Sequence, residues 1–170
     1  MTVDSYISTP VLSKVSGELT IIVAAPLWKD GIANSEVIGV VYFVPKETFL
    51  NDIMNTIHVS ENGGAYMIDK DGYTIADTTM QTVTVQNIEN EAQKDSSLQE
   101  LANAHKEMRA GKSNVTRYSI NGEEKFIAYT PLEGTDGWSV AVTAPVSDFM
   151  GATIRNIIIV IILVIVSALV

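Results

Sequence analysis

The chain has 170 residues, enough for one domain of ordinary size, and carries 11 basic against 20 acidic residues. Its formal net charge of −9 argues against nucleic-acid binding, which requires a basic patch, and its 46% hydrophobic content excludes a disordered acidic segment. Because the sequence contains no cysteine, it can form no disulfide, thiolate zinc site or cysteine nucleophile. We therefore expect a folded domain without a nucleic-acid partner.

The first part of the chain predicts a β-hairpin followed by a helix. Two β-rich runs, residues 19–28 and 37–44, flank a polar turn region. Apolar residues then recur at three- and four-residue steps between residues 46 and 57, which is typical of one face of a helix.

Residues 62–145 predict a separate module in the order strand, strand, helix, strand, strand, strand. A tight turn at residues 69–72 joins the first two strands, and Asn121-Gly122 is a strong hairpin signal between two later ones. We expect the helix to begin at a cap on Ser96 or Ser97. This order fits the α+β class, with a PAS-like antiparallel five-stranded sheet and a helix on one face.

The C-terminus is an almost unbroken apolar run. From Ile157 to Val170 every residue is apolar except Ser167, and the last charged residue is Arg155. A helix of this length reaches about 21 Å, short of the roughly 30 Å hydrocarbon core, so we expect a truncated transmembrane helix within residues 146–170. A buried core helix is the alternative interpretation.

The N-terminal residues lack the basic and apolar stretches of a signal peptide. Two interpretations stay open at this point. Either the chain is a complete protein with one C-terminal anchor and a cytoplasmic domain, or it begins inside a longer protein whose first transmembrane segment lies upstream.

No group of residues has the spacing of an active site. The two histidines, His58 and His105, lie on different predicted elements without a neighbouring metal ligand, and His105 falls on the inward stripe of its helix, which favours a partly buried structural role. The acidic residues within 69–72 favour turn chemistry, because a calcium-binding EF-hand requires alternating ligands over about twelve residues. We expect no catalytic residue, metal site, cofactor or enzymatic activity.

Four segments resemble the double Cache (dCache) family of extracytoplasmic sensor domains. Residues 7–26 resemble the late pocket segment of the membrane-distal module, and residues 38–41 resemble the strand that follows it. Residues 64–76 resemble the opening hairpin of the membrane-proximal module, and residues 137–145 resemble its last strand, which a transmembrane helix follows in the family. The order of these segments along the chain is that of the family.

The resemblance implies a partial membrane-distal Cache module at residues 1–45, a connector helix at 46–61, a membrane-proximal PAS-like module at 62–145 and the transmembrane helix at 146–170. It places residues 1 to about 153 outside the cytoplasm, in a homodimeric protein of the cell membrane. The implied function is small-molecule sensing and transmembrane signal transduction, most often in a methyl-accepting chemotaxis receptor. The alternatives are the sensor of a histidine kinase or cyclic-nucleotide enzyme, and a small membrane-anchored binding protein.

The resemblance also indicates where a ligand would bind. Family members that bind amino acids carry a tyrosine and an acid around a Pro-Tyr-x-Asp stretch, and a second acid at the end of the Gly-Val-Val strand. Here Val11 follows Pro10, Ser13 stands at the first acidic position and Val44 at the second. Because a desolvated ammonium group requires a negative partner, a pocket lined by Val11, Ser13 and Val44 predicts an organic acid or neutral metabolite rather than an amino acid. The alternative is that these three are ordinary strand and turn residues.

Overall fold

A five-stranded antiparallel sheet forms the body of the protein, as seen in a computed structural model that describes residues 5–12, 14, 19–46, 48–78, 83–84 and 86–151. Its order is β7-β6-β10-β9-β8, which confirms the predicted five-stranded sheet of the α+β class. The strands are β6 (Gly64–Ile68), β7 (Thr74–Asp77), β8 (Asn114–Ile120), β9 (Glu123–Pro131) and β10 (Ser139–Pro145).

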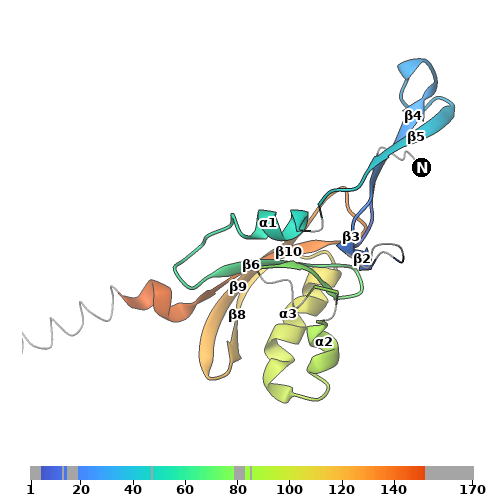
Figure 1. Ribbon diagram of the computed structural model, residues 1–170. Helices are drawn as coiled ribbons and strands as arrows, with labels where there is room; N and C mark the ends of the chain where they lie inside the picture. Colours follow the sequence, from blue (N-terminus) through green and yellow to red (C-terminus); the bar gives the residue numbers. More distant parts are fainter. Residues whose placement is uncertain are drawn as a thin grey trace, which may run out of the picture.

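Helices pack on both faces of this sheet (Figure 1). On one face lies α1 (Phe49–Met54), and on the other lie α2 (Ile88–Glu91), the 3-10 turn η2 (Ser96–Leu98) and α3 (Gln99–Arg109). Successive side chains of a strand point to opposite faces, so β6 contributes to two cores. Its Met67 packs in one core with Met54 of α1, whereas its Ile68 packs in the other with Met108 of α3.

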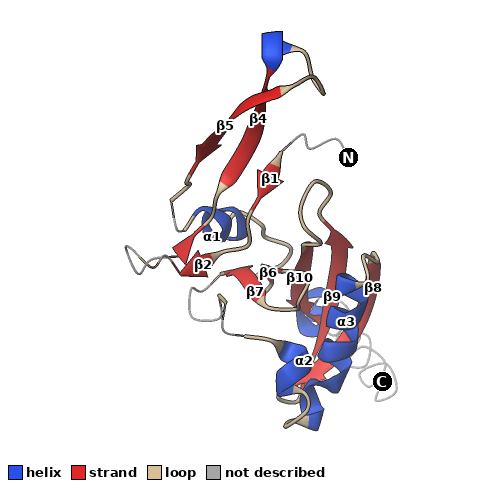
Figure 2. Cartoon of the chain, turned by 90° about the vertical axis from the view of Figure 1, so that its right-hand side faces the viewer, coloured by secondary structure: helices blue, strands red, loops and turns tan. Residues whose placement is uncertain are grey.

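The N-terminal part forms two smaller antiparallel sheets. The first contains β1 (Tyr6–Ile7), β4 (Val23–Trp28) and β5 (Val37–Phe43), and the second pairs β2 (Val11–Leu12) with β3 (Leu19–Thr20). The β4–β5 hairpin projects away from the five-stranded sheet and turns at the 3-10 segment η1 (Lys29–Gly31) (Figures 1 and 2).

The strand predicted over residues 19–28 is interrupted between β3 and β4. Ile21 is buried in the same core as α1, and the backbone N–H of Ile22 donates to Ser8 Oγ at 2.9 Å instead of to a neighbouring strand. The single predicted strand is therefore two strands, each belonging to a different sheet.

The helix predicted over residues 46–57 is also shorter than expected. It ends at Met54, because the amide and hydroxyl groups of Thr56 both donate to the carbonyl of Ile53, at 3.0 and 2.7 Å, and so close the last turn.

The capping prediction at Ser96 or Ser97 was wrong. Asp95 is the N-cap of η2, the 3-10 turn that leads into α3. The carboxylate of Asp95 accepts from the backbone N–H of Ser97 at 2.9 Å and from Ser97 Oγ at 2.7 Å. Glu100, in the first turn of α3, accepts from the backbone N–H of Ser119 at 2.8 Å. A carboxylate one residue upstream thus replaces the expected serine hydroxyl.

The turn at residues 69–72 has the predicted structural role. One carboxylate oxygen of Asp69 accepts from the backbone N–H groups of Asp71 and Tyr73, both at 2.9 Å. The side chain of Asp69 therefore organises the β6–β7 turn, as turn chemistry predicts.

Strand β10 continues into helical residues 146–151, at the end of the sheet opposite the hairpin (Figure 1). Within the described part of the chain, no helix combines the length and the apolar character that crossing a bilayer requires. The predicted transmembrane run from Ile157 to Val170 lies outside the described residues.

Candidate ligand-binding site

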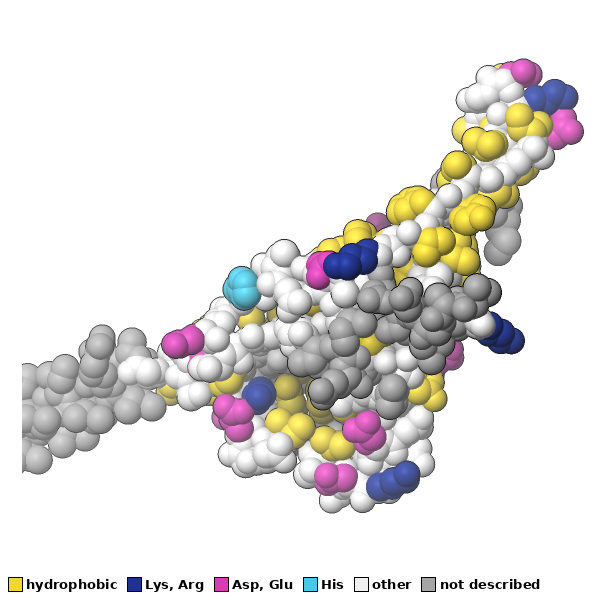
Figure 3. Space-filling model, viewed as in Figure 1, with side chains coloured by type: hydrophobic (Ala, Val, Ile, Leu, Met, Phe, Trp, Pro, Cys, Tyr) yellow, Lys and Arg dark blue, Asp and Glu magenta, His cyan; other side chains and the backbone are white. Residues whose placement is uncertain are grey.

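The β1–β4–β5 sheet presents apolar side chains to solvent on both faces. Adjacent strand residues point to opposite sides, yet nearly every residue of β5 is more than half exposed. These exposed residues are Val37, Ile38, Val40, Val41, Tyr42 and Phe43. Figure 3 shows the apolar surface running along the hairpin. An apolar surface of this extent is typical of an interaction or ligand-binding site.

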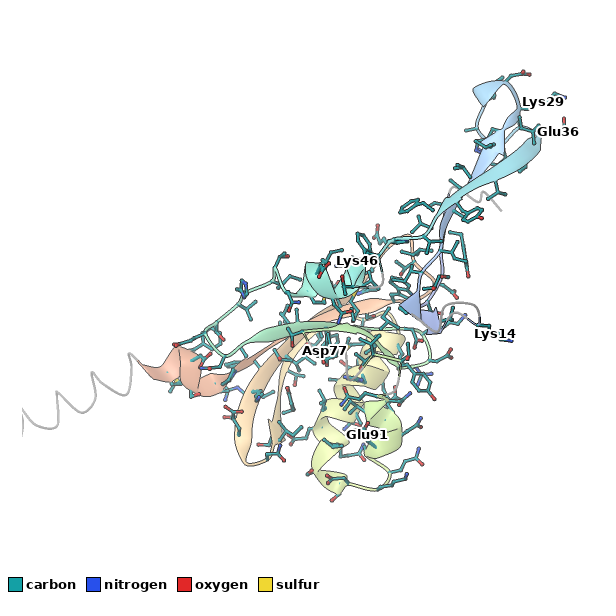
Figure 4. All side chains as sticks on the ribbon, viewed as in Figure 1. Lys14, Lys29, Glu36, Lys46, Asp77 and Glu91 are labelled. Carbon is teal, nitrogen blue, oxygen red and sulfur yellow. The ribbon has the colours of Figure 1, made fainter. Side chains whose placement is uncertain are left out.

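Charged side chains of the hairpin gather at its tip. Lys29 Nζ lies 2.8 Å from Glu36 Oε2, far from the base of the hairpin (Figure 4), and Asp30 lies in the tip turn. Lys14 and Lys46 lie near the base, outside the helices and strands (Figure 4). In the described part of the first 46 residues, the acids are therefore confined to the tip, away from the apolar faces.

The structure does not bring the predicted pocket residues into one sheet. Val11 lies in β2, where it pairs with Thr20, and its side chain is 52% exposed. Val44 directly follows β5 in the other sheet and is 53% exposed. Ser13 lies outside the described residues. The pocket of Val11, Ser13 and Val44 therefore stays a prediction.

An apolar hollow of about 480 Å³ lies over β8, β9 and β10. Val115, Ala128 and Val142 contribute to its lining, and these side chains lie on the sheet face opposite α3. The hollow can accept an apolar surface, but it contains no charged side chain that would orient a small polar ligand.

A polar hollow of about 420 Å³ lies between the β6–β7 turn and helices α2 and α3. Arg109 and Glu89 both line it, and Arg109 Nη1 lies 3.0 Å from each carboxylate oxygen of Glu89. Arg109 Nε also donates to the carbonyl of Lys70 at 2.8 Å. These charges hold the turn against the two helices, and their pairing fits a structural role.

His105 is fully buried rather than partly buried as predicted. Its side chain is 1% exposed, and its Nε2 lies 2.8 Å from the hydroxyl of Tyr66 on β6. Burial lowers the pKa of His105 to about 4 and raises the pKa of Tyr66 well above its usual value. His105 is therefore neutral at physiological pH and inaccessible to an external ligand. Among the described residues, no cluster of histidine and acidic side chains could hold a metal ion.

Asp148, Ser60 and Asn62 form a polar cluster that the sequence patterns did not predict. The carboxylate of Asp148 accepts hydrogen bonds from Ser60 and Asn62, residues more than eighty positions earlier in the chain. Local periodicity carries no signal for such a distant contact, although an acidic residue in the first turn of a helix is a common pattern.

The chain matches a family model over residues 2–153, and that model, of the double Cache type, is described as a Cache domain. Among curated proteins, none matches the chain. The solved structures compared below are at most 20% identical to this chain. Their similarity therefore shows a shared fold and nothing more.

One similar structure is the periplasmic sensory domain of the Campylobacter jejuni chemoreceptor Tlp1, with 20% identity, a TM-score of 0.59 and coverage of 86% of this chain and 50% of that one. Another is the extracellular domain of mmHK1S-Z2, described as a histidine kinase, with 16% identity, a TM-score of 0.60 and coverage of 86% and 52%. The ligand-binding domain of the Pseudomonas fluorescens chemoreceptor CtaA, in complex with L-serine, has 15% identity, a TM-score of 0.55 and coverage of 85% and 56%.

The chain thus spans about half the length of the solved domains that it matches. The family model, by contrast, covers most of this chain and confirms the resemblance found in its sequence. The chain belongs to the Cache domain family, in its double Cache form.

Proposed function

We propose that the chain is the sensor part of a membrane receptor that detects a small molecule outside the cytoplasm. The observation that carries this proposal is the family match over residues 2–153, since Cache domains are ligand-binding sensor domains. The fold neighbours are periplasmic, extracellular or ligand-binding parts of chemoreceptors and of a protein described as a histidine kinase, which supports the same function. The output is a change of conformation passed to the membrane rather than a chemical reaction.

In this proposal, residues 1–45 belong to a membrane-distal module and residues 62–145 form the membrane-proximal one. The apolar faces of the β1–β4–β5 sheet support the first assignment, because such a sheet is stable only when further layers cover it. The greater length of the solved neighbours supports the presence of those layers in the full-length protein. Residues from about 153 onward would then enter the membrane.

A methyl-accepting chemotaxis receptor is the receptor type that we propose. The chemoreceptor domains of Tlp1 and CtaA support it, and the similarity to mmHK1S-Z2 favours a histidine kinase as the second candidate. Ligand-dependent methylation of the full-length receptor in its native cells would support the first type, whereas ligand-dependent autophosphorylation would support the second.

The ligand that we propose is an organic acid or a neutral metabolite. The CtaA domain was solved with L-serine, and another similar structure, the ligand-binding domain of Mlp24, was solved with asparagine. The resemblance of the sequence to the family places Ser13 and Val44 where amino-acid-binding members carry acids. The acids described near the hairpin, Asp30 and Glu36, lie at its tip. A buried ammonium group without its partner costs about 3–5 kcal/mol, so micromolar affinity would weaken by a factor of about a thousand.

A thermal-shift comparison of the complete extracytoplasmic domain tests this proposal. Acetate, lactate, succinate and malate are compared with the common amino acids, each at 1 mM. A ligand present at about 100 times its Kd adds about 2.7 kcal/mol of stability, or a rise of roughly 5–10 °C in Tm for a domain of this class. We expect a rise with at least one carboxylate and none with the amino acids.

The variant Val44→Asp provides a sharper comparison, and Val44→Asn is its uncharged control. If Val44 lines the pocket, the new carboxylate should abolish stabilisation by the organic acid, while the asparagine variant should retain part of it. Stabilisation of the unmodified domain by several amino acids, with no effect of the carboxylates, would contradict the proposed ligand class.

A further inference from the structure

The carboxylate of Asp148 joins two segments that are far apart in the sequence. Asp148 lies in the first turn of the helical residues 146–151, directly after β10. One of its oxygens accepts from Ser60 Oγ at 2.6 Å and from the backbone N–H of Asn62 at 2.8 Å, and the other accepts from Asn62 Nδ2 at 3.0 Å. Both donors belong to the loop that follows α1 (residues 55–63), here called the post-α1 loop. Hydrogen bonds to a charged acceptor are stronger than neutral ones.

The post-α1 loop is packed closely against the end of β10. A Cβ atom on Gly63 would lie 2.8 Å from Val59 Cγ2, 2.9 Å from Ser60 Oγ and 2.9 Å from the carbonyl oxygen of Thr143. A glycine at this position therefore lets the loop lie directly on the last strand before the helical residues 146–151.

The same loop is continuous with a helix that is anchored in the core. In α1, Leu50 and Met54 are buried, and Asn51 Nδ2 donates to the carbonyl of Asp77 on β7 at 2.7 Å. The hairpin strand β5 leads into α1 through residues 44–48. In the sensing function proposed above, a displacement of the hairpin would pass along this connection to α1 and from α1 to the post-α1 loop.

The hydrogen bonds from Ser60 and Asn62 also lower the pKa of Asp148, so its carboxylate remains charged throughout the neutral range. A second contact holds the same helical turn, because the rings of Phe149 and Phe126 meet edge to face with their centroids 5.9 Å apart. Helical residues 146–151 are thus held from two sides, by the post-α1 loop and by β9.

We propose that Asp148 is the positioning residue through which the post-α1 loop controls the helical residues 146–151. In the sensing function proposed above, on which this inference rests, these residues lead toward the membrane, and the carboxylate transmits the displacement that begins at the hairpin. Asp148 has this role because it belongs to the helical residues 146–151 and accepts hydrogen bonds from the post-α1 loop.

Hydrogen exchange of the full 170-residue chain in detergent micelles tests the proposal without any ligand. The double variant Ser60→Ala/Asn62→Ala removes both side-chain donors and leaves Asp148 unchanged. We expect amides in a peptide covering residues 146–151 to exchange about tenfold faster, equivalent to about 1.4 kcal/mol. Amides of α3 should exchange at the unmodified rate, which shows that the fold is intact.

The matched control is Ser97→Ala, which removes the same kind of bond, from Ser97 Oγ to Asp95 at 2.7 Å, at a site remote from the post-α1 loop. This control should leave exchange in residues 146–151 unchanged. In an Asp148→Ala background the double variant should add no further acceleration, because its acceptor is already absent. Asp148→Leu, which has a similar shape but no acceptor oxygen, serves if the alanine variant does not fold.

Unchanged exchange in residues 146–151 of the double variant would overturn the proposal and would leave β10 and Phe126 as the elements that position the turn. Acceleration that persists in the Asp148→Ala background would overturn it equally, since the loop would then act by another route. Neither result depends on ligand binding, so failure here and failure of the ligand screen are distinguishable.

Discussion

The buried His105 makes the stability of the protein depend on pH. Its pKa is about 4 in the folded protein and 6.5 in an unfolded chain. Between these two pH values the His105 side chain is protonated in the unfolded chain but neutral in the folded protein, so a fall in pH favours unfolding. The stabilising effect is complete above pH 6.5 and is lost as the pH falls toward 4.

The size of the effect follows from the gap between the two pKa values. At about 1.4 kcal/mol per pKa unit, the gap corresponds to about 3 kcal/mol of unfolding free energy lost by pH 4. Solvent screening does not reduce this value, because the side chain is only 1% exposed. A loss of this size is a large fraction of the 5–15 kcal/mol typical of whole proteins.

Urea unfolding at half-unit steps from pH 4 to pH 7.5 measures the effect. His105→Gln keeps a polar partner for the hydroxyl of Tyr66 but cannot be protonated, and His58→Gln is the control at the exposed second histidine. Relative to His105→Gln, the unmodified protein should lose about 3 kcal/mol between pH 6.5 and pH 4, because the other titrating groups are common to both. Parallel stability curves for these two proteins would refute the reasoning.

Two further pairs of substitutions test the packing. Gly63→Ala should destabilise the fold by about 1–3 kcal/mol, because its Cβ would lie 2.9 Å from the carbonyl oxygen of Thr143, whereas Gly64→Ala meets its nearest neighbour at 3.9 Å and should be close to neutral in urea unfolding. Ile127→Ala, at a fully buried residue of β9, should cost about 2–5 kcal/mol, while Val115→Ala, at a side chain 66% exposed, should lie within about 0.5 kcal/mol of zero in the same assay.

The five-stranded sheet could be predicted because its signals are local. Asn121 and Gly122 have φ values of 53° and 78°, the left-handed pair that an Asn-Gly hairpin turn requires, and their sequence alone indicated that turn. The turn at residues 69–72 and the alternation within β9 and β10 are local in the same way. These turns account for the hairpin pairs, whereas the pairing of β6 with β10 joins strands that are far apart in the sequence.

Other features depend on contacts that no local pattern records. Asp95 rather than Ser96 is the cap because the extended backbone before the 3-10 turn is at residue 95. The strand is interrupted between β3 and β4 because Ile21 is buried in the core beside α1. The bonds between Asp148 and the post-α1 loop join residues 86 and 88 positions apart. Such contacts arise from tertiary packing rather than from local propensity.

The candidate pocket shows the same limit. The resemblance places Val11 and Val44 in one pocket, yet Val11 belongs to the β2–β3 sheet and Val44 directly follows β5 of the β1–β4–β5 sheet. The residues next to Val11 and Val44 in the sequence do not determine the distance between β2 and β5, because β5 exposes apolar side chains on both of its faces. Covering layers on the β1–β4–β5 sheet would decide that geometry.

The most direct test of the sensing account is hydrogen exchange of the complete extracytoplasmic domain with and without succinate, malate, lactate or acetate at 1 mM. The account predicts that at least one of these acids slows exchange in β4 and β5, the strands whose apolar faces would border the ligand, and leaves α2 and α3 unchanged. Absence of protection in β4 and β5 with every acid, together with protection by amino acids or protection confined to α2 and α3, would contradict it.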